Sequence, residues 1–249
     1  MRFYNNLCGQ DAPNIIYKYL PNVDSKTAFI ENLKTQSEDW PYRTIDIEYS
    51  YNNYGHRSKN IHDIKLDNYI LYIGCSHTEG VGVRLEDSYP YITSSQMNCD
   101  YYNLAIGGTG IDIIEYNLIT WFTTIKQKPK YVVIQWPDHS RFISAYPGYE
   151  RYERLIPNGS WAEDNYTKRF LSSGEATGFF NARKHISYKL IKEIVDVPIV
   201  DVHFTSLASY SNDSTLFRRI DLGRDLAHSG IKSHQAIANQ IIAYIKSLK

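Results

Sequence analysis

The sequence predicts an α/β protein of three layers, in which helices cover both faces of a mainly parallel, doubly wound sheet. Short apolar or aromatic runs alternate along the chain with segments of helical periodicity, and several of the runs end abruptly in small or polar residues. Buried parallel strands read as continuous apolar runs, and their alternation with helices indicates βαβ units. A chain of 249 residues is long enough for one such domain with an appendage.

The first quarter of the chain, residues 1–66, gives mixed signals, and we expect it to be an extension packed on the core. Residues 14–20 fit either a short helix or a strand, and residues 25–33 read as a capped helix. Residues 49–59 are rich in Tyr, Asn and Ser, which predicts a loop. The main domain is expected to span residues 67–249.

The first buried strand, Tyr69–Ile73, leads directly into a turn of small residues that carries Ser76. Groups just past the carboxyl end of a strand line the ligand crevice of an open α/β sheet. Ser76 is therefore a candidate nucleophile. Because side chains alternate in direction where a strand ends, Cys75 is expected to face away from the crevice, although a thiolate would be a rival nucleophile.

The remaining elements follow in order along the chain. We expect helices at about 88–97, 111–126, 180–195 and 231–248, and strands at 100–105, 131–136 and 198–204. The helix at 180–195 is expected to bury Ile186, Leu190, Ile191 and Ile194 on one face. An insertion at about 142–179 has no sustained periodicity and is expected to form a loop-rich lid or specificity wall.

A serine nucleophile needs a base, and the base needs a group that orients it. The stretch Asp225-Leu-Ala-His228, just before the last helix, supplies both on one loop. The Asp225 carboxylate would accept the Nδ1 proton of His228, so that Nε2 faces Ser76. His203, on a predicted strand, is a rival base. The predicted catalytic residues are Ser76, Asp225 and His228.

Three stretches resemble the conserved blocks of the SGNH (GDSL-like) hydrolases. Gly74-Cys-Ser-His-Thr-Glu-Gly-Val-Gly82 resembles the Gly-Asp-Ser-x-x-x-Gly block, Asn103–Gly108 resembles the second block, and Asp225-x-x-His228 resembles the final one. The resemblance covers the chain from about residue 68 onward. It implies a flavodoxin-like SGNH fold, a serine nucleophile, and an oxyanion hole formed by the backbone amides of Ser76 and Gly108.

The sequence departs from that family in two places. Cys75 stands where the family usually has aspartate, and Pro137-Asp-His-Ser-Arg141 stands where the third block would supply Gly-x-Asn-Asp. The family's side-chain amide donor to the oxyanion is therefore missing. A carboxylate at Asp138 has the wrong charge to replace it, whereas Thr109, His139 or Arg141 could donate instead. The candidate substrate-binding residues are His77, Thr109, Asp138 and Arg141, and Glu79 is expected to lie on the rim with His77.

These residues predict a serine esterase that acts on small acyl groups, O-acetyl groups of a carbohydrate above all. The aromatic residues of the insertion, which either stack on sugar rings or pack the insertion itself, are Tyr146, Tyr149, Tyr152, Trp161 and Tyr166. Three alternatives stay open: an acyltransferase with the same triad, a catalytically weak or silent glycan-binding module of a phage particle, and an α/β-hydrolase fold. The last would need glycine in place of Thr78.

Composition excludes several other classes of function. Lys plus Arg and Asp plus Glu are each 27, so no overall field attracts nucleic acid or an anionic membrane. The apolar runs are too short to span a bilayer, and the amino terminus lacks the apolar core of a secretory signal, which favours a cytoplasmic location or association with a virion. Cys8, Cys75 and Cys99 have no paired spacing, and no metal or other cofactor is expected.

Overall fold

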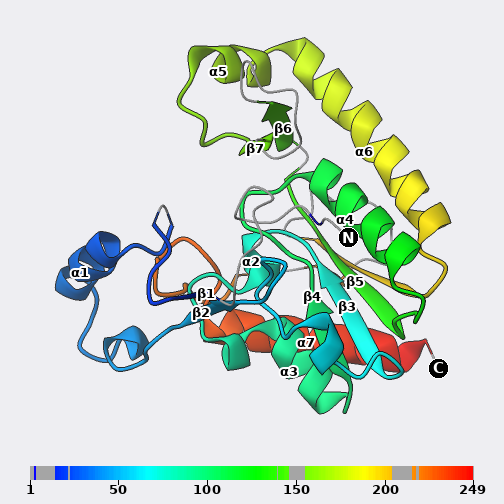
Figure 1. The fold of residues 1–249 in the computed structure, drawn as a ribbon. Helices are drawn as coiled ribbons and strands as arrows, with labels where there is room; N and C mark the ends of the chain where they lie inside the picture. The colour runs from blue at the N-terminus through cyan, green and yellow to red at the C-terminus, as the bar shows by residue number, and fades with distance from the viewer. Residues whose placement is uncertain are drawn as a thin grey trace.

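The computed structural model describes residues 3, 15–21, 23–138, 140–145, 155–203, 215–216 and 219–248. Its main sheet has the strand order β4-β3-β5-β8-β9, and neighbouring strands are parallel throughout (Figure 1). These strands are β3 (Tyr69–Ile73), β4 (Asp100–Asn103), β5 (Tyr131–Trp136), β8 (Ile199–His203) and β9 (Thr215–Leu216). The order reverses at β3, so the sheet is doubly wound and has a crevice at the carboxyl ends of β3 and its neighbours.

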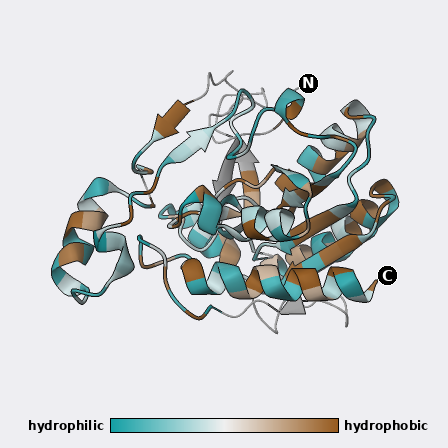
Figure 2. Ribbon diagram, turned by 90° about the horizontal axis from the view of Figure 1, so that it is seen from below, coloured by the Kyte–Doolittle hydropathy of each residue, from teal (hydrophilic) through white to brown (hydrophobic). Residues whose placement is uncertain are grey.

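Helices cover both faces of this sheet, which confirms the predicted three-layer α/β/α class. In Figure 1, α4 (Ile111–Thr124) and α6 (Gly174–Ile194) lie on one face, and α3 (Tyr89–Gln96) and α7 (Ile231–Ser247) lie on the other. The apolar strands lie between these layers in Figure 2. No helix in the described ranges combines the length and apolar character needed to cross a membrane.

The side chains of β3 alternate between the two layers, as a period of two residues requires. Leu71 belongs to the core that includes Ile114 and Leu118 of α4. Tyr72 belongs to the opposite core, beside Ile241 of α7. All five residues of β3 are at most 1 % exposed, so the strand before Ser76 is fixed from both sides.

The N-terminal segment forms a small unit beside the sheet. Strand β1 (Ile15–Tyr17) pairs antiparallel with β2 (Tyr49–Tyr51), and between them lies α1 (Lys26–Thr35), whose N-cap is Ser25. The predicted helix at 25–33 is confirmed. The loop predicted for residues 49–59 is wrong at its start, because Tyr49 and Tyr51 form a strand and are buried. Short 3₁₀ turns lie at Pro41–Arg43, Ile61–Asp63 and Leu85–Asp87.

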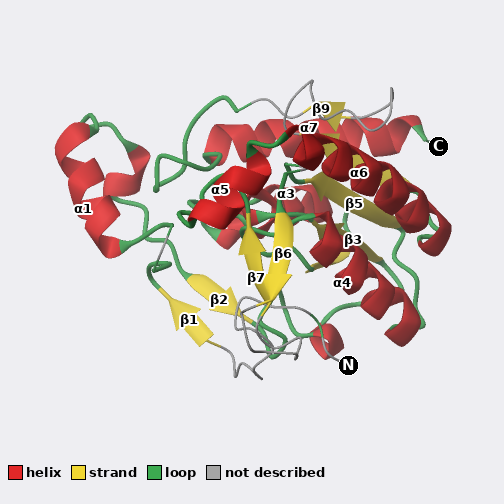
Figure 3. Cartoon of the chain, turned by 90° about the horizontal axis from the view of Figure 1, so that it is seen from above, coloured by secondary structure: helices red, strands yellow, loops and turns green. Residues whose placement is uncertain are grey.

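The insertion contains more regular structure than its composition predicts. Strands β6 (Phe142–Ala145) and β7 (Leu155–Asn158) pair antiparallel, and α5 (Asn165–Leu171) follows them above the sheet (Figure 3). Helix α6 begins at Gly174 rather than at residue 180, because Ser173 caps it by accepting a hydrogen bond from the Ala176 amide. The expectation of a loop-rich insertion up to residue 179 was therefore wrong.

The buried face of α6 matches the predicted one only in part. Ile186 is 64 % exposed and Leu190 is 43 % exposed, whereas Phe180, Ser187 and Ile191 are buried. The apolar spacing of the first two residues fitted a helix but did not reveal which stripe meets the neighbouring layer. Of the predicted residues, Ile191 is buried and Ile194 is partly buried, and the helix packs through the stripe that carries Phe180, Ser187 and Ile191.

Candidate active site

Ser76 lies at the carboxyl end of β3, in the position that the sequence predicts. It begins the single turn α2 (Ser76–Glu79), and Gly80, with φ of +83°, ends that turn. Amides of Thr78 and Glu79 donate to the carbonyl of Cys75, 3.0 Å away in each case. The amide of Ser76 itself is at the start of the turn, where backbone N–H groups have no partner within the helix. Ser76 is 6 % exposed.

His228 and Asp225 extend from Ser76 in one chain of hydrogen bonds. His228 Nε2 is 2.8 Å from Ser76 Oγ, and His228 Nδ1 is hydrogen-bonded to Asp225 Oδ2. Asp225 Oδ1 accepts from the amides of His228 (3.0 Å) and Ala227 (3.2 Å). Burial disfavours the charged carboxylate, but the hydrogen bonds and charge of His228 outweigh burial and hold the pKa of Asp225 below its usual value. The carboxylate is thus ionised and directed at the imidazole.

The serine turn and the acid–base loop are in direct backbone contact at Gly82. The carbonyl of Gly82 accepts from the Arg224 amide at 2.9 Å. A Cβ at Gly82 would lie 3.0 Å from Asp225 Oδ1, and the residue has φ of +84°. Only glycine meets both conditions without strain. The glycine that resembles the end of the first block is therefore what allows the two loops to approach.

The N-terminal segment holds the same two loops from outside. Arg224, next to Asp225, makes a buried ion pair with Asp24 (2.7 Å), and Tyr49 Oη is hydrogen-bonded to Asp24 as well. The Gly82 amide donates to Tyr49 Oη at 3.0 Å. Arg57 donates to carbonyls on both sides of this region, those of Glu48, Gly80 and Val83. Residues before position 66 therefore help to fix the spacing between Ser76 and His228.

Glu79 is buried and ties the serine turn to the glycine turn of residues 107–110. Its Oε2 accepts from the Gly107 amide at 2.6 Å, and Tyr51 Oη donates to Oε1 at 2.6 Å. Burial raises the pKa of Glu79, although the hydrogen bond from Tyr51 opposes the change. The expectation that Glu79 lies on the rim was wrong, because the turn places it three residues after Ser76, facing inward.

The predicted oxyanion turn lies beside the nucleophile. A Cβ at Gly107 would be 3.6 Å from Ser76 Cβ. Since the Gly107 amide already donates to Glu79, the next amide, that of Gly108, is the candidate donor together with that of Ser76. Gly108 has φ of +77°, a conformation that favours glycine.

Cys75 faces the sheet rather than the crevice. Its amide (3.2 Å) and its Sγ (3.0 Å) both contact Gln135 Oε1 on β5, and the residue is 1 % exposed. Sγ lies 4.0 Å from Ser76 Oγ, too far for a strong interaction. Gln135, on the neighbouring strand β5, is the polar partner of Cys75, and the sequence analysis assigned it no role. Its position within the apolar run Tyr131–Trp136 gave no sign of this contact.

His77 lies beside the triad. Its Nδ1 is 3.0 Å from Ser229 Oγ, and its ring centroid is 4.9 Å from that of His228. Burial, and then the neighbouring His228, His234, Arg141 and Arg219, hold the pKa of His77 well below its usual value. His77 is therefore neutral near pH 7 and next to the reacting groups.

The rival histidines are elsewhere. His203 is buried on β8 and stacked on Trp136, with ring centroids 6.4 Å apart. His234 is buried on α7, where its Nδ1 accepts from the Tyr89 amide at 3.1 Å. Ser76 is hydrogen-bonded to His228 and to neither of these.

The residues considered as substitutes for the missing asparagine differ in whether their polar groups already have partners within the protein. Thr109 donates its hydroxyl to the Ile106 carbonyl at 2.7 Å, so that hydroxyl is engaged. Asp138 is exposed, and its Oδ1 accepts from the amide and hydroxyl of Ser140. Arg141 keeps two buried nitrogens, Nε and Nη1, without a partner among the described residues. His139, like Tyr146, Tyr149 and Tyr152 of the insertion, lies outside the described residues.

Sequence reasoning missed the residues that support the triad from a distance. Tyr51 contacts Glu79 across 28 residues, and Asp24 contacts Arg224 across 200. No local pattern signals such pairs. Across the ranges that the structure describes, no group of three or more His, Cys, Asp or Glu side chains could hold a metal ion.

No protein-family model and no curated protein matches this sequence. Solved structures of similar fold include the acetyl xylan esterase Est2A of the rumen bacterium Butyrivibrio proteoclasticus, at 14 % identity and a TM-score of 0.47, over 72 % of this chain and 63 % of that one. A family two carbohydrate esterase from Clostridium thermocellum matches at 18 % identity and a TM-score of 0.44, over 73 % and 64 %. A member of the lipolytic G-D-S-L family from Veillonella parvula matches at 13 % identity and 0.34, over 72 % and 73 %.

These matches include proteins of the family that the sequence blocks resemble. The chain spans less than two thirds of the length of the first two. Identities and TM-scores of this size carry no information about activity. The chemistry of this site therefore has to come from its own geometry.

Proposed function

We propose that this protein is a serine esterase that hydrolyses small acyl esters, in particular O-acetyl esters of a carbohydrate. The observation that carries the proposal is the chain of contacts from Ser76 Oγ through His228 to Asp225, at the carboxyl end of a central strand. A hydroxyl, a base within hydrogen-bond reach and a buried carboxylate behind the base are the parts that nucleophilic acyl transfer requires.

In the proposed acylation step, His228 Nε2 takes the proton of Ser76 as Oγ attacks the ester carbonyl carbon. Asp225 accepts from Nδ1–H, which keeps Nε2 free as a base and stabilises the imidazolium that forms. The amides of Ser76 and Gly108 would donate to the developing oxyanion. The imidazolium then returns its proton to the leaving alcohol oxygen, and the acyl group stays on Ser76.

Deacylation repeats the same steps with water as the nucleophile. His228 removes a proton from the water as it attacks the acyl-enzyme carbonyl, and the proton passes to Ser76 Oγ when the acid leaves. The site favours a small acyl group, since Ser76 is only 6 % exposed and Gly107 lies against it. Exposed aromatic side chains on the insertion, Trp161 (46 %) and Tyr166 (79 %), support a sugar as the alcohol part, because aromatic faces stack on apolar faces of rings.

The test is hydrolysis of p-nitrophenyl acetate by the unchanged protein and by Ser76→Ala. We expect turnover to fall by at least about 10⁴-fold in the variant, as the loss of a triad nucleophile does. Equal rates for the two proteins would contradict the proposal.

The glycan-binding alternative is favoured by one feature, the replacement of the third-block asparagine by the Pro137–Arg141 stretch. If that alternative holds, the unchanged protein releases no acetate from p-nitrophenyl acetate or from acetylated xylan, yet retains affinity for the glycan. An acyltransferase would instead transfer acetyl to an added sugar alcohol faster than to water, which product analysis in the same assay would show.

A further inference from the structure

Leu226 has an unusual backbone conformation within the loop that carries Asp225 and His228. Its φ of +56° lies in the left-handed region. That region is uncommon for residues other than glycine, and it is costly for a bulky side chain. The Leu226 amide donates to the Gly223 carbonyl at 3.0 Å, so the strained residue closes a tight turn around Asp225. Such a conformation persists only where the surrounding structure holds it.

The side chain of Leu226 is held by the N-terminal segment. It packs, partly buried, against a hydrophobic cluster whose buried members are Trp40, Tyr42, Ile47, Tyr49, Tyr51 and Val83. All of these except Val83 come from the N-terminal segment, and Val83 follows the serine turn. The apolar contact offsets the cost of the left-handed conformation, because it is made only while the turn keeps its shape.

Arg224, on the other side of Asp225, is anchored in the same segment. Its guanidinium forms the buried ion pair with Asp24, and its carbonyl accepts from Asn32 Nδ2 at 3.0 Å. The side chain of Asp225 itself is fully shielded and is hydrogen-bonded to His228. In Figure 1 this loop, in orange, runs beside β1 and β2 before α7 begins. Both neighbours of Asp225 therefore bind the N-terminal segment, while Asp225 contacts the base.

We propose that Leu226 is a positioning residue, whose side chain, packed in the N-terminal cluster, keeps the turn in the conformation that directs Asp225 at His228. The inference rests on the proposed esterase function. Without the side chain, nothing offsets the strain at position 226, and Arg224 fixes Asp225 from one side only. The turn then relaxes toward ordinary φ values, and the carboxylate moves with it.

This assignment gives the described part of the N-terminal segment, which lies outside the family resemblance, a role in the reaction. Asp225 holds the imidazole in the tautomer that can accept the Ser76 proton. A displaced carboxylate therefore slows acyl transfer, whereas the binding of the substrate is nearly unchanged.

The experiment compares Leu226→Ala with Ile45→Ala. Ile45 is also partly buried against the same cluster, but it lies before β2 and not on the loop. With p-nitrophenyl acetate, we expect Leu226→Ala to lower kcat by about 10- to 100-fold with little change in KM, the size of effect that a displaced catalytic group has. Ile45→Ala should keep kcat, although urea unfolding should show a comparable loss of stability in both variants. Leu226→Met, which keeps the apolar contact, should restore most of kcat.

Leu226→Gly separates the side chain from the backbone conformation. Glycine adopts a φ of +56° without strain, so the turn can form, but the anchor in the cluster is lost. We expect kcat to fall about as far as in Leu226→Ala. Proton NMR provides a second measurement, because the Nδ1 proton of His228 resonates far downfield while it is donated to a carboxylate. This signal should weaken or move upfield in both Leu226 variants and stay unchanged in Ile45→Ala.

Three results would overturn the inference: full kcat in Leu226→Ala or Leu226→Gly, an equal loss of kcat in Ile45→Ala, or a lower kcat with an unchanged Nδ1 proton signal. If one of them is found while p-nitrophenyl acetate is hydrolysed in a Ser76-dependent manner, the esterase proposal stands and the inference falls. If the unchanged protein does not hydrolyse p-nitrophenyl acetate, the esterase proposal itself fails. The Nδ1 proton signal then decides alone whether Leu226 positions Asp225.

Discussion

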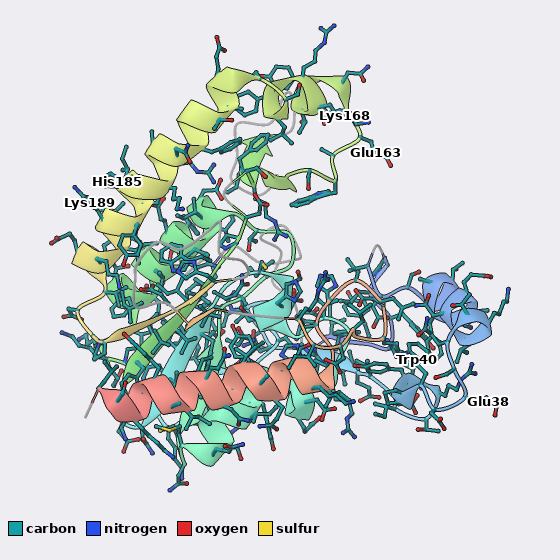
Figure 4. All side chains as sticks on the ribbon, turned by 180° about the vertical axis from the view of Figure 1, so that it is seen from behind. Glu38, Trp40, Glu163, Lys168, His185 and Lys189 are labelled. Atoms are coloured by element: carbon teal, nitrogen blue, oxygen red, sulfur yellow. The ribbon has the colours of Figure 1, made fainter. Side chains whose placement is uncertain are left out.

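The two walls of the site use their polar groups in different ways. In the triad wall, formed by residues 74–83, 103–109 and 222–229, Ser76, Glu79 and Asp225 are bonded to named partners within the protein. In the insertion wall, formed by the described residues of 137–183, Arg141 keeps unpaired donors, and Trp161 and Tyr166 expose their rings. Figure 4 shows the insertion, with Glu163 and Lys168, projecting above the sheet, away from Glu38 and Trp40 of the N-terminal segment.

Under the proposed function, this difference corresponds to a division between acyl transfer and substrate recognition. Groups that must act in one fixed geometry are held by buried contacts from several elements, since small displacements are costly in catalysis. Under the proposed function, the exposed aromatic rings of the insertion wall would contact the substrate. Changes in the triad wall should therefore lower kcat, whereas changes in the insertion wall should alter the choice of substrate.

The largest effect is expected from Asp225→Asn. The asparagine amide can donate to His228 Nδ1, which favours the tautomer that carries its proton on Nε2. In that tautomer Nε2 cannot accept the Ser76 proton. We expect kcat for p-nitrophenyl acetate to fall by about 10⁴-fold, with little change in the unfolding temperature. Asp63→Asn, at a half-exposed carboxylate on a 3₁₀ turn, is the control. A loss below about tenfold would remove Asp225 from the mechanism.

Gly108→Val tests the oxyanion turn. Because Gly108 has φ of +77°, a β-branched residue should shift the amide and remove one donor, which lowers kcat by about 10²- to 10³-fold. Gly178→Val, in α6 where a Cβ would meet nothing within 4 Å, is the control. Urea unfolding of both variants separates a misplaced donor from a damaged fold. An unchanged kcat in a folded Gly108→Val protein would show that this amide is not a donor.

Glu79→Ala probes the contact between the serine turn and Gly107. Without the carboxylate, the Gly107 amide and the Tyr51 hydroxyl lose their buried partner, so the oxyanion turn is less well positioned. We expect kcat to fall by about 10- to 100-fold with little change in KM, and Glu79→Gln to restore part of it. If KM rises while kcat holds, Glu79 acts on binding of the substrate instead.

A smaller effect concerns acid stability. Burial, and then the charge of Arg57, lower the pKa of His234 to about 3 from an ordinary value of 6.5. The unfolded state therefore binds the proton first, and the folded state loses stability as the pH falls below about 6.5. Between pH 7.5 and pH 5 we expect a loss of about 2 kcal/mol in the unfolding free energy from this residue.

Urea unfolding of the unchanged protein and of His234→Asn at both pH values measures the contribution of His234 to the unfolding free energy. The asparagine can accept from the Tyr89 amide but does not titrate in this range. The variant should lose about 2 kcal/mol less than the unchanged protein over the same interval. The same pH dependence in both proteins would assign the loss to other groups.

Local sequence patterns were enough to predict the central part of this molecule. Apolar runs located β3 and β5, helical spacing located α4 and α7, and the blocks around Ser76 and His228 located the two loops that the structure brings within 2.8 Å of each other. Each of these signals lies within a few neighbouring residues, because the periodicity of strands and helices and the geometry of turns depend on local sequence.

The rest depends on contacts between distant segments. Glu79 was expected on the rim, but charged side chains are buried only with partners, and its partners are the Gly107 amide and Tyr51, which lies on a strand predicted as loop. The exposed Ile186 shows the same limit, since periodicity finds a helix but not the layer that it packs against. Among the candidate oxyanion donors, the sequence could not show that the hydroxyl of Thr109 is engaged by the Ile106 carbonyl.

The most direct test of the central claim is covalent labelling. If His228 and Asp225 activate Ser76, an organophosphonate should add once per chain, on Ser76, and His228→Ala should abolish the addition. Intact-mass measurement and peptide mapping report the stoichiometry and the site, and a thiol reagent should leave labelling and esterase activity largely unchanged because Cys75 is buried against Gln135. An adduct on Cys75, or equal labelling of Ser76 with and without His228, would contradict the account.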